Sequence, residues 1–414
     1  MKLRAAFLFD NFGPYHIARV KAVCGVFDLL AIEFGASSSE YAWSRGTVEE
    51  FQRTVVNEAG ASEEMANFDF STRLNGILSG FKPRVVFVPG WASRGALLTL
   101  RWCVDHCVPA VVMSESTVWD ESRNYFKEWI KRKIIMHFSA GLVGGSPHQV
   151  YLEQLGISPN IIFQGYDVVD NDYFLNKVDE VRGRKIEVSQ LIGMPRNFFL
   201  ASARFIEKKN LHRLIKAYAS YRERSIKRDE RCQDQSLEKT NDKSEDLWDL
   251  VLLGDGPLRG ELEELRFRLG LEEVIHMPGF RNYEELPSYY AMAGGFLHPS
   301  TTDQWGLVVN EAMAAGLPVL VSNRCGCASN LVQEGGNGWT FDPADVDQLA
   351  FLMGKIASDV PLRSAMGAKS REIIKDWSLA RFLKGATDAA DTAIRTFRPR
   401  GNCFLNLVIW AISK

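Results

Sequence analysis

Two acidic residues with a fixed spacing lie where one apolar run ends and a helical pattern begins. Asp303 is in a polar loop after the strand-like run 295–297, and Glu311 follows eight residues later in the helical pattern. Backbone N–H groups at the start of a helix are unpaired and, with the helix dipole, favour an anion. Gly306, next to Leu307, would let a ligand approach this backbone closely. The segment therefore suits an anionic group such as a diphosphate, and Glu311 could reach a hydroxyl beside it.

Two basic residues follow another apolar run. Arg204 comes after the run 198–203, and Lys209 precedes the next helical pattern. Cations fixed at the carboxyl edge of a parallel sheet would neutralise the charge that develops on a diphosphate leaving group. Taken alone, each pattern has a simpler explanation: a basic loop exposed to water, or a helix cap at Asp303 and a surface acid at Glu311.

A glycine-rich turn spans residues 254–260. It nearly fits a dinucleotide-binding fingerprint, but its spacing is GxGxxxG rather than GxGxxG. The fingerprint also needs an acid at the end of the following strand, where this chain has Pro278 and Gly279. Both departures disfavour a nicotinamide cofactor.

The elements that must position these residues are strand-like apolar runs alternating with helical patterns. This alternation is typical of parallel sheets covered by helices on both faces. Two such series, divided near residues 176–192, predict two doubly wound α/β domains, in which ligands gather outside the carboxyl ends of the strands. Residues 222–247 are highly charged and poor in large apolar groups, which predicts an exposed insertion after a helix.

The composition is that of a globular protein with room for two cores, since 46% of the 414 residues are hydrophobic and 24% are charged. A net charge of -2, from 49 basic and 51 acidic residues, argues against nucleic acid as the main partner. Seven cysteines without a CxxC pair or a secretory leader favour a reducing, cytoplasmic compartment. Cys103 and Cys107, with His106 between them, lack a second ligand pair for zinc, so a buried helix face is expected there.

The C-terminal tail combines arginines with the mostly apolar run 405–412, which is too short to cross a bilayer. It could lie on the cytoplasmic face of a membrane or dock on the protein core. Docking is the favoured interpretation.

The segment 298–322 closely resembles the signature of retaining glycosyltransferases of family 4. Their pattern is a proline-serine strand end, Glu-x7-Glu across a loop and helix, and Ala-Met-Ala-x-Gly-x-Pro-Val, and this chain has PS, DQWGLVVNE, AMAAG and LPV. Asp303 stands where the family usually has Glu, which shifts the charge by about one methylene. The resemblance implies that Asp303 and Glu311 contact the donor sugar at the catalytic centre, beside Gly306 and Leu307.

Two further segments resemble the same family. The run ARFIEKKN is similar to its R-x4-K-N segment, which implies that Arg204 and Lys209 hold the nucleotide diphosphate during catalysis. The turn at Gly254 is also common in the family. The resemblance implies that Gly279, Phe280 and Arg281 line the nucleobase, mostly through their backbone.

The N-terminal half carries weaker resemblances. Gly13 lies in the first strand-to-helix turn, where the family has a glycine pair that closes on the donor phosphate. His16 begins the next helix and could contact a substrate or be structural. Glu115 follows the fourth apolar run, near a position where relatives often carry histidine; it could orient an acceptor hydroxyl or cap the next segment.

The resemblance covers nearly the whole chain and implies the GT-B fold, with two facing Rossmann-like domains. The expected divisions are an acceptor domain 1–185, a donor domain 186–376 and a segment 377–414 that crosses back onto the first domain. The implied reaction moves a sugar from a nucleotide-diphosphate sugar to a hydroxyl of a sugar, lipid-linked or small-molecule acceptor, with retention and without a metal cofactor. A nucleotide-sugar epimerase, a phosphorylase and a non-catalytic binding module are the alternatives.

Overall fold

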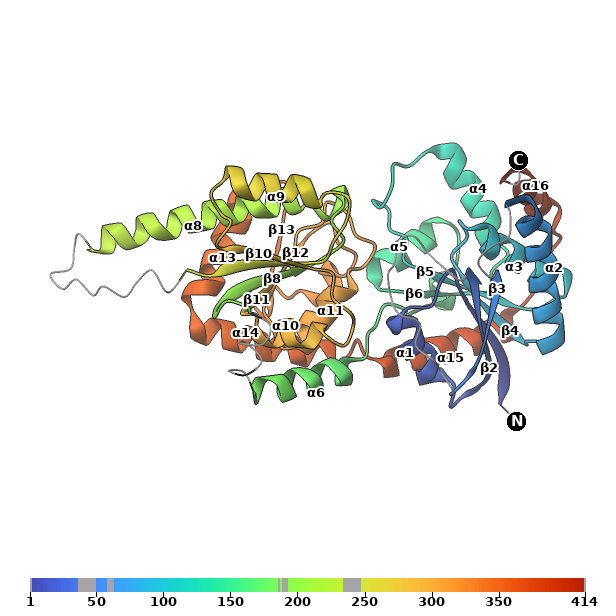
Figure 1. Ribbon diagram of the computed structural model, residues 1–414. Helices are drawn as coiled ribbons and strands as arrows, with labels where there is room; N and C mark the ends of the chain where they lie inside the picture. The colour runs from blue at the N-terminus through green and yellow to red at the C-terminus, as the bar shows by residue number, and fades with distance from the viewer. Residues whose placement is uncertain are drawn as a thin grey trace. The chain divides into compact units, whose positions relative to one another are not determined.

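The computed structural model describes residues 2–35, 50–57, 63–184, 187, 193–233 and 247–412. The chain forms two compact units (Figure 1). The N-terminal domain comprises Met1–Asp170 and Trp377–Lys414, and the C-terminal domain comprises Asn171–Asp376.

The first division between the domains lies at Asp170, not at residue 185 as the sequence suggested. Helix α6 (Asn171–Arg182) follows this point and packs on α10 (Leu286–Met292) and α11 (Leu307–Ala314). Because α6 buries Phe174 and Val178 in these contacts, it belongs to the C-terminal domain. The second division, at residue 376, agrees with the expected one.

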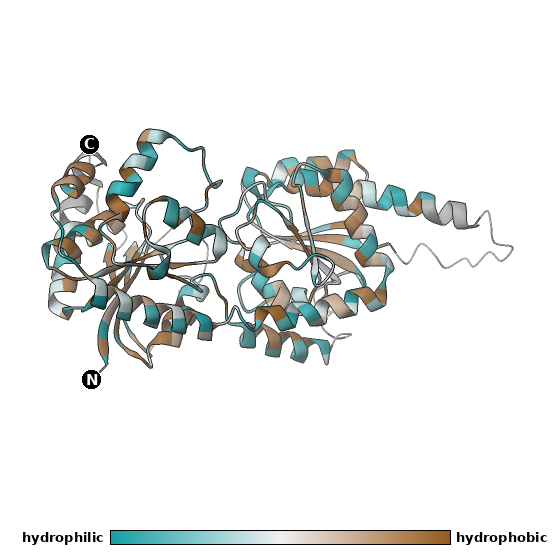
Figure 2. Cartoon of the chain, turned by 180° about the vertical axis from the view of Figure 1, so that it is seen from behind, coloured by the Kyte–Doolittle hydropathy of each residue, from teal (hydrophilic) through white to brown (hydrophobic). Residues whose placement is uncertain are grey.

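The N-terminal domain is built on a seven-stranded parallel sheet with strand order β3-β2-β1-β4-β5-β6-β7. Its central strands are almost entirely apolar, as strands covered on both faces must be. Figure 2 shows this as brown along the strands of both sheets. The strands are β1 (Leu3–Phe9), β2 (Phe27–Gly35), β3 (Gln52–Asn57), β4 (Val85–Pro89), β5 (Ala110–Ser114), β6 (Ala140–Val143) and β7 (Ile162–Gln164).

Two apolar cores cover the two faces of this sheet. On one face, Phe7 and Phe87 pack with Phe382 of the C-terminal segment. On the other, Leu8 and Val88 pack against helices that precede residue 170 and against the tail. The helices are α1 (Pro14–Val23), α2 (Glu63–Phe81), α3 (Arg94–Asp105), α4 (Tyr125–Ile135), α5 (Ser146–Gln154), the 3-10 turn η1 (Pro159–Ile161), α15 (Leu379–Thr396) and α16 (Cys403–Ile412).

The C-terminal segment returns to the N-terminal domain as expected. Helix α15 packs on α1 and on strands β5 to β7, and α16 packs on α3 and α4. Leu405 and Ile409 of α16 are buried, so the tail docks on the core through one face. No helix among the parts of the chain that the structure describes is both long and apolar enough to cross a membrane.

The C-terminal domain has a six-stranded parallel sheet in the order β10-β9-β8-β11-β12-β13. The chain therefore reverses direction across the sheet between β8 and β11, and this switch point is where ligands bind in doubly wound folds. The strands are β8 (Phe198–Ser202), β9 (Asp249–Leu253), β10 (Ile275–Gly279), β11 (Gly295–His298), β12 (Val319–Ser322) and β13 (Gly338–Phe341).

Helices again cover both faces of this sheet. Helix α8 continues through residues 222–233, which the sequence assigned to an insertion; residues 234–246 lie outside the described part of the chain. Its first half packs Leu214 and Tyr218 into the core, and α13 runs beside it. The remaining helices are η2 (Glu207–Lys209), α8 (Leu211–Gln233), α9 (Arg259–Arg268), α12 (Ala328–Leu331), α13 (Val346–Ser358) and α14 (Val360–Ile374).

Candidate functional site

The loops after β8 and β11 bring Lys209, Asp303 and His298 together at the switch point of the C-terminal sheet. Lys209 Nζ lies 2.5 Å from Asp303 Oδ2, and His298 Nε2 lies 2.8 Å from the same oxygen. The loop after β12 fixes the Asp303 backbone, because Asp303 N–H donates to the Arg324 carbonyl and its own carbonyl accepts from Gly326. Strands β8 and β11 are neighbours, so residues 94 positions apart in sequence meet at one sheet edge.

The charge state of this cluster follows from its surroundings. Burial opposes ionisation of Asp303, but Lys209 and the hydrogen bond from His298 hold the pKa of the carboxyl well below its usual range. Burial lowers the pKa of His298, so its ring is neutral near pH 7. A neutral ring that donates to Asp303 must carry its proton on Nε2. Lys209 and His298 both donate to Oδ2 of Asp303, so these two donors orient the ionised carboxylate.

Helix α11 begins directly after this cluster, as the sequence predicted. Gly306 caps it with φ 103°, a left-handed conformation that favours glycine. A Cβ at this position would lie 2.9 Å from His298 Nε2, so glycine also lets the loop close over the histidine. The first N–H groups of α11, beginning with Leu307, leave an N-terminus that favours negative charge.

Glu311 lies inside the domain rather than on its surface. Its side chain is fully buried, and its Oε2 accepts a 2.6 Å hydrogen bond from Tyr290 Oη of α10. The alternative of a solvated surface acid is therefore wrong. A hydrogen bond to a buried carboxylate is stronger than one between neutral groups, so Tyr290 fixes the position of Glu311.

The glycine-rich turn after β9 packs against the loop that carries Arg204. A Cβ at Gly254 would lie 1.9 Å from the Ala203 carbonyl oxygen, and one at Gly256 would lie 2.7 Å from that of Phe205. Phe205 N–H donates to the Asp255 carbonyl at 2.9 Å. The two glycines thus hold the backbone on either side of Arg204. This close packing explains why residue 254 is a glycine. A contact between Gly254 and a donor stays a prediction.

The residues predicted to line a nucleobase follow β10. Gly279 has φ 89° and its carbonyl accepts from the Gly254 N–H. Phe280 is exposed, while Arg281 Nε donates to Tyr289 Oη at 2.6 Å. Arg281 is therefore engaged within the domain, which leaves backbone groups and the exposed ring of Phe280 as the means of contact.

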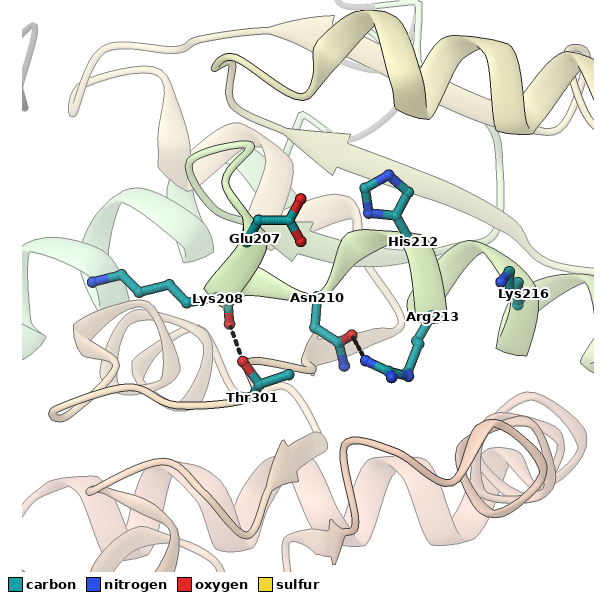
Figure 3. Close-up of a pocket in the computed structure, with 7 residues that line it drawn as sticks. All are labelled: Glu207, Lys208, Asn210, His212, Arg213, Lys216 and Thr301. Atoms are coloured by element: carbon teal, nitrogen blue, oxygen red, sulfur yellow. Dashed lines mark hydrogen bonds between the residues drawn. The ribbon is translucent and has the colours of Figure 1, made fainter. Parts of the chain in front are cut away.

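A pocket of about 530 Å³ opens beside this region, at the start of α8 (Figure 3). Thr301 closes one side by donating from its hydroxyl to the Lys208 carbonyl, and Arg213 donates to Asn210 Oδ1 on the other. None of the predicted site residues line this pocket, so it is distinct from the predicted donor site. Its lining is Glu207, Lys208, Asn210, His212, Arg213, Lys216 and Thr301.

In the N-terminal domain, Gly13 and His16 form the start of α1. The Gly13 N–H donates to His16 Nδ1 at 3.2 Å, and the imidazole ring lies 4.7 Å from the ring of Phe9. Burial and the nearby Arg19 charge lower the pKa of His16 to about 3. His16 therefore caps the start of α1, the Gly13 N–H is already paired, and a contact between His16 and a substrate stays a prediction. A direct contact between Gly13 and a donor phosphate stays a prediction.

The low pKa of His16 predicts that the protein loses stability in mild acid. The unfolded histidine binds a proton below about pH 6.5, whereas the folded one does so only near pH 3, so falling pH favours unfolding. Each pH unit in this window costs about 1.4 kcal/mol from His16. His16→Asn keeps an acceptor for Gly13 without a titrating ring. Denaturant unfolding at pH 7 and pH 5 should show a smaller pH dependence for this variant; equal dependence would exclude His16 as the source.

The carboxyl edge of the N-terminal sheet gathers two acids. Asp10 follows β1 and Glu115 follows β5, and β4 lies between these strands. Burial raises the pKa of Asp10, opposed by a hydrogen bond with Ser93 after β4. Burial and then the charge of Glu115 raise the pKa of Tyr166, which places Glu115 near that buried ring. Asp10 was not predicted as a site residue. Its position directly after the first apolar run could have indicated that it lies at the carboxyl edge of the sheet.

The cysteine and histidine residues flagged as a possible zinc site lie at the end of α3. Cys103 is buried, and His106 Nδ1 lies 2.9 Å from the Trp102 carbonyl. The expected buried helix face is correct for Cys103 only, because α3 ends at Asp105 and both His106 and Cys107 are exposed in the turn that follows. Within the described ranges, no group of three or more His, Cys, Asp or Glu residues could hold a metal ion.

Comparison with known proteins connects the C-terminal domain to a family. Residues 184–373 match the sequence model of the family described as Glycosyl transferases group 1. The sulfoquinovosyl transferase SQD2 of Arabidopsis thaliana is 32% identical over 170 residues, which cover 40% of this chain and 32% of that protein. The GDP-mannose-dependent alpha-(1-6)-phosphatidylinositol monomannoside mannosyltransferase of Mycobacterium tuberculosis is 33% identical over 156 residues, covering 34% of this chain and 40% of that protein. The chain thus matches less than half the length of these relatives.

The whole chain also resembles a solved structure. The crystal structure of Anabaena Alr3699/HepE in complex with UDP and glucose is 17% identical, with a TM-score of 0.67 over 93% of this chain and 98% of that one. This likeness concerns the fold. Residues 184–373 thus match the glycosyl transferases group 1 family, and the two Rossmann-like domains have the GT-B fold.

Proposed function

We propose that this protein is a retaining glycosyltransferase that moves a sugar from a nucleotide-diphosphate sugar to an acceptor hydroxyl. The observation that carries the proposal is the Lys209–Asp303–His298 cluster at the switch point of a glycosyl transferases group 1 domain. Ligands of doubly wound domains bind at this position, and the cluster puts a cation and an oriented carboxylate there.

In the proposed reaction, the bond between the anomeric carbon and the diphosphate oxygen breaks while a bond to the acceptor oxygen forms on the same face. Arg204, Lys209 and the N-terminus of α11 stabilise the charge on the leaving diphosphate. The acceptor proton passes to the departing phosphate. Asp303 positions a sugar hydroxyl. Glu311 is fully buried beside Tyr290, so it contacts the sugar only when the side chains that cover it move apart. No covalent glycosyl-enzyme forms, so trapping one on Asp303 or Glu115 would contradict this path.

The relatives support a nucleotide-sugar donor and a glycan or glycolipid product. One is named as GDP-mannose-dependent and another as a sulfoquinovosyl transferase, and the structural neighbour binds UDP and glucose. The exposed ring of Phe280 and the backbone at Gly279 offer contacts to the nucleobase.

A thermal-shift screen of UDP and GDP sugars tests the donor assignment. A donor at about a hundred times its dissociation constant stabilises the folded state by about 2.7 kcal/mol, or roughly 5 to 10 °C for a domain of this size. We expect one base to give this shift, with EDTA leaving it unchanged because cationic side chains replace a metal. If no nucleotide sugar raises the melting temperature, the donor site is wrong.

An epimerase or a phosphorylase is the alternative with the same architecture. An epimerase would convert the nucleotide sugar alone, whereas a phosphorylase would need inorganic phosphate to receive the sugar. Incubating the identified donor with and without candidate acceptors therefore separates these activities. A transferase transfers the sugar to the acceptor with release of nucleoside diphosphate; an epimerase changes the donor sugar alone.

A further inference from the structure

Helix α4 of the N-terminal domain exposes a stripe of large apolar side chains. Tyr125 is 88% exposed and Phe126 is 64% exposed, and Trp129 and Met136 are also exposed. At helical spacing these four residues fall on one face, while Ile135 on another face is buried in the core. Apart from Trp129, the fold does not use these side chains for packing, and their exposure needs another explanation.

The charges on the same face all have one sign. Arg132 and Lys133 lie among the exposed apolar residues, at positions three and four after Trp129. The acid of this helix points elsewhere, because Glu128 pairs with Lys131 at 3.0 Å and accepts from Tyr151. These inward contacts also fix the helix, so the stripe is held in place.

The tail helix α16 extends this face. Phe404 packs edge-to-face on Trp129, with ring centroids 5.6 Å apart, and Leu407 is 59% exposed. The chain leading into α16 is held at the end of α4, because His137 Nε2 donates to the Gly401 carbonyl at 3.1 Å. This connection brings the exposed Arg400 next to the same region.

We infer that this α4–α16 surface, formed by Tyr125, Phe126, Trp129, Arg132, Lys133, Met136 and Leu407, docks on an anionic lipid bilayer. Amphipathic aromatic rings settle at the level of lipid headgroups, and arginine and lysine are attracted to anionic lipids. A second copy of this chain fits less well, since a two-fold contact would place like charges together. The inference does not depend on the proposed transferase activity.

Vesicle co-sedimentation tests this surface with the full-length protein. We expect binding to phosphatidylcholine vesicles that contain phosphatidylglycerol, and weak binding to phosphatidylcholine alone. Arg132→Glu/Lys133→Glu and Phe126→Ala/Trp129→Ala should each lower the partition coefficient by about tenfold or more. Hydrogen exchange with vesicles should slow at residues 124–137 and 401–412.

A matched control lies on α9 of the other domain, where Phe267 is 70% exposed next to Arg268. Phe267→Ala/Arg268→Glu should bind vesicles as the unmodified protein does. The charge variant keeps every apolar contact of α4, so an unchanged melting temperature shows that it is folded. Undiminished vesicle binding by both α4 variants would overturn the inference. Concentration-dependent self-association that these variants abolish, without vesicle binding, would also overturn it in favour of a dimer contact.

Discussion

Replacing Lys209 by Ala should weaken binding of the donor's nucleoside diphosphate by roughly thirty- to hundredfold. A charge-assisted hydrogen bond between a lysine and a phosphate contributes about 2 to 3 kcal/mol, which corresponds to this factor in the dissociation constant. Lys209 is held by Asp303 at the end of η2, so its ammonium group is placed before any ligand arrives. Preorganisation makes its loss more costly than the loss of a mobile surface lysine.

The adjacent Lys208 provides the matched control. Its side chain is exposed, and only its backbone carbonyl contacts the loop after β11, through Thr301. Isothermal titration calorimetry with the base identified by thermal shift should give near-native affinity for Lys208→Ala and the large loss for Lys209→Ala. Equal affinity in both variants would remove Lys209 from the donor site.

Replacing Glu311 by Gln should lower kcat/KM by about a hundredfold with little change in stability. Glutamine has nearly the same volume and its carbonyl can still accept from Tyr290, but it offers a sugar hydroxyl a neutral partner instead of a charged one. A loss of about 2 to 3 kcal/mol in transition-state stabilisation is expected when such a contact is made in the transition state. Steady-state kinetics and the melting temperature of the same preparations measure both effects.

Two further variants separate the chemistry of Glu311 from its packing. Glu311→Ala removes the closer acceptor of the Tyr290 hydroxyl, leaving the longer contact with the Val308 carbonyl, and empties space in the core; it should reduce the free energy of unfolding by about 1 to 3 kcal/mol. Tyr290→Phe removes the hydrogen bond but keeps the carboxylate, so it should retain more activity than Glu311→Gln. If Glu311→Gln keeps native kcat/KM, the carboxylate is only structural.

Much of the C-terminal domain could be predicted from the sequence because its strands are short, continuous apolar runs. The loops that follow β8 and β11 both carried polar residues, and the topology of a doubly wound sheet brings such loops together. The contact between Lys209 and Asp303 agrees with that expectation. Periodicity and motif spacing fix which loops meet, but not which side chains pair.

The sequence therefore did not predict which side chains form hydrogen bonds with Asp303 and Glu311. His298 is the last residue of a buried strand, and a histidine there has no pattern that distinguishes a ligand from a core residue. Tyr290 comes from α10, more than twenty residues before Glu311, and only tertiary packing joins them. The extension of α8 was missed for a different reason: charged residues on an exposed helix look like a loop when few apolar positions mark the period.

The N-terminal domain was less predictable than the C-terminal domain. Strands β3 and β7 lie at the edges of the N-terminal sheet and are short or partly polar, so their pattern is weak. His16 begins a helix beside the sheet edge, which is compatible with catalysis and with capping. Its hydrogen bond from Gly13 shows the capping contact, and a substrate contact stays a prediction.

NMR of the reaction mixture, with the identified donor and an acceptor, tests the proposed retaining transfer. Nucleoside diphosphate should appear in a one-to-one ratio with a glycoside whose anomeric configuration matches that of the donor. This product should be strongly reduced for Lys209→Ala and kept for Lys208→Ala. A sugar nucleotide converted equally well without acceptor, or a product unaffected by Lys209→Ala, would show that the proposed function is wrong.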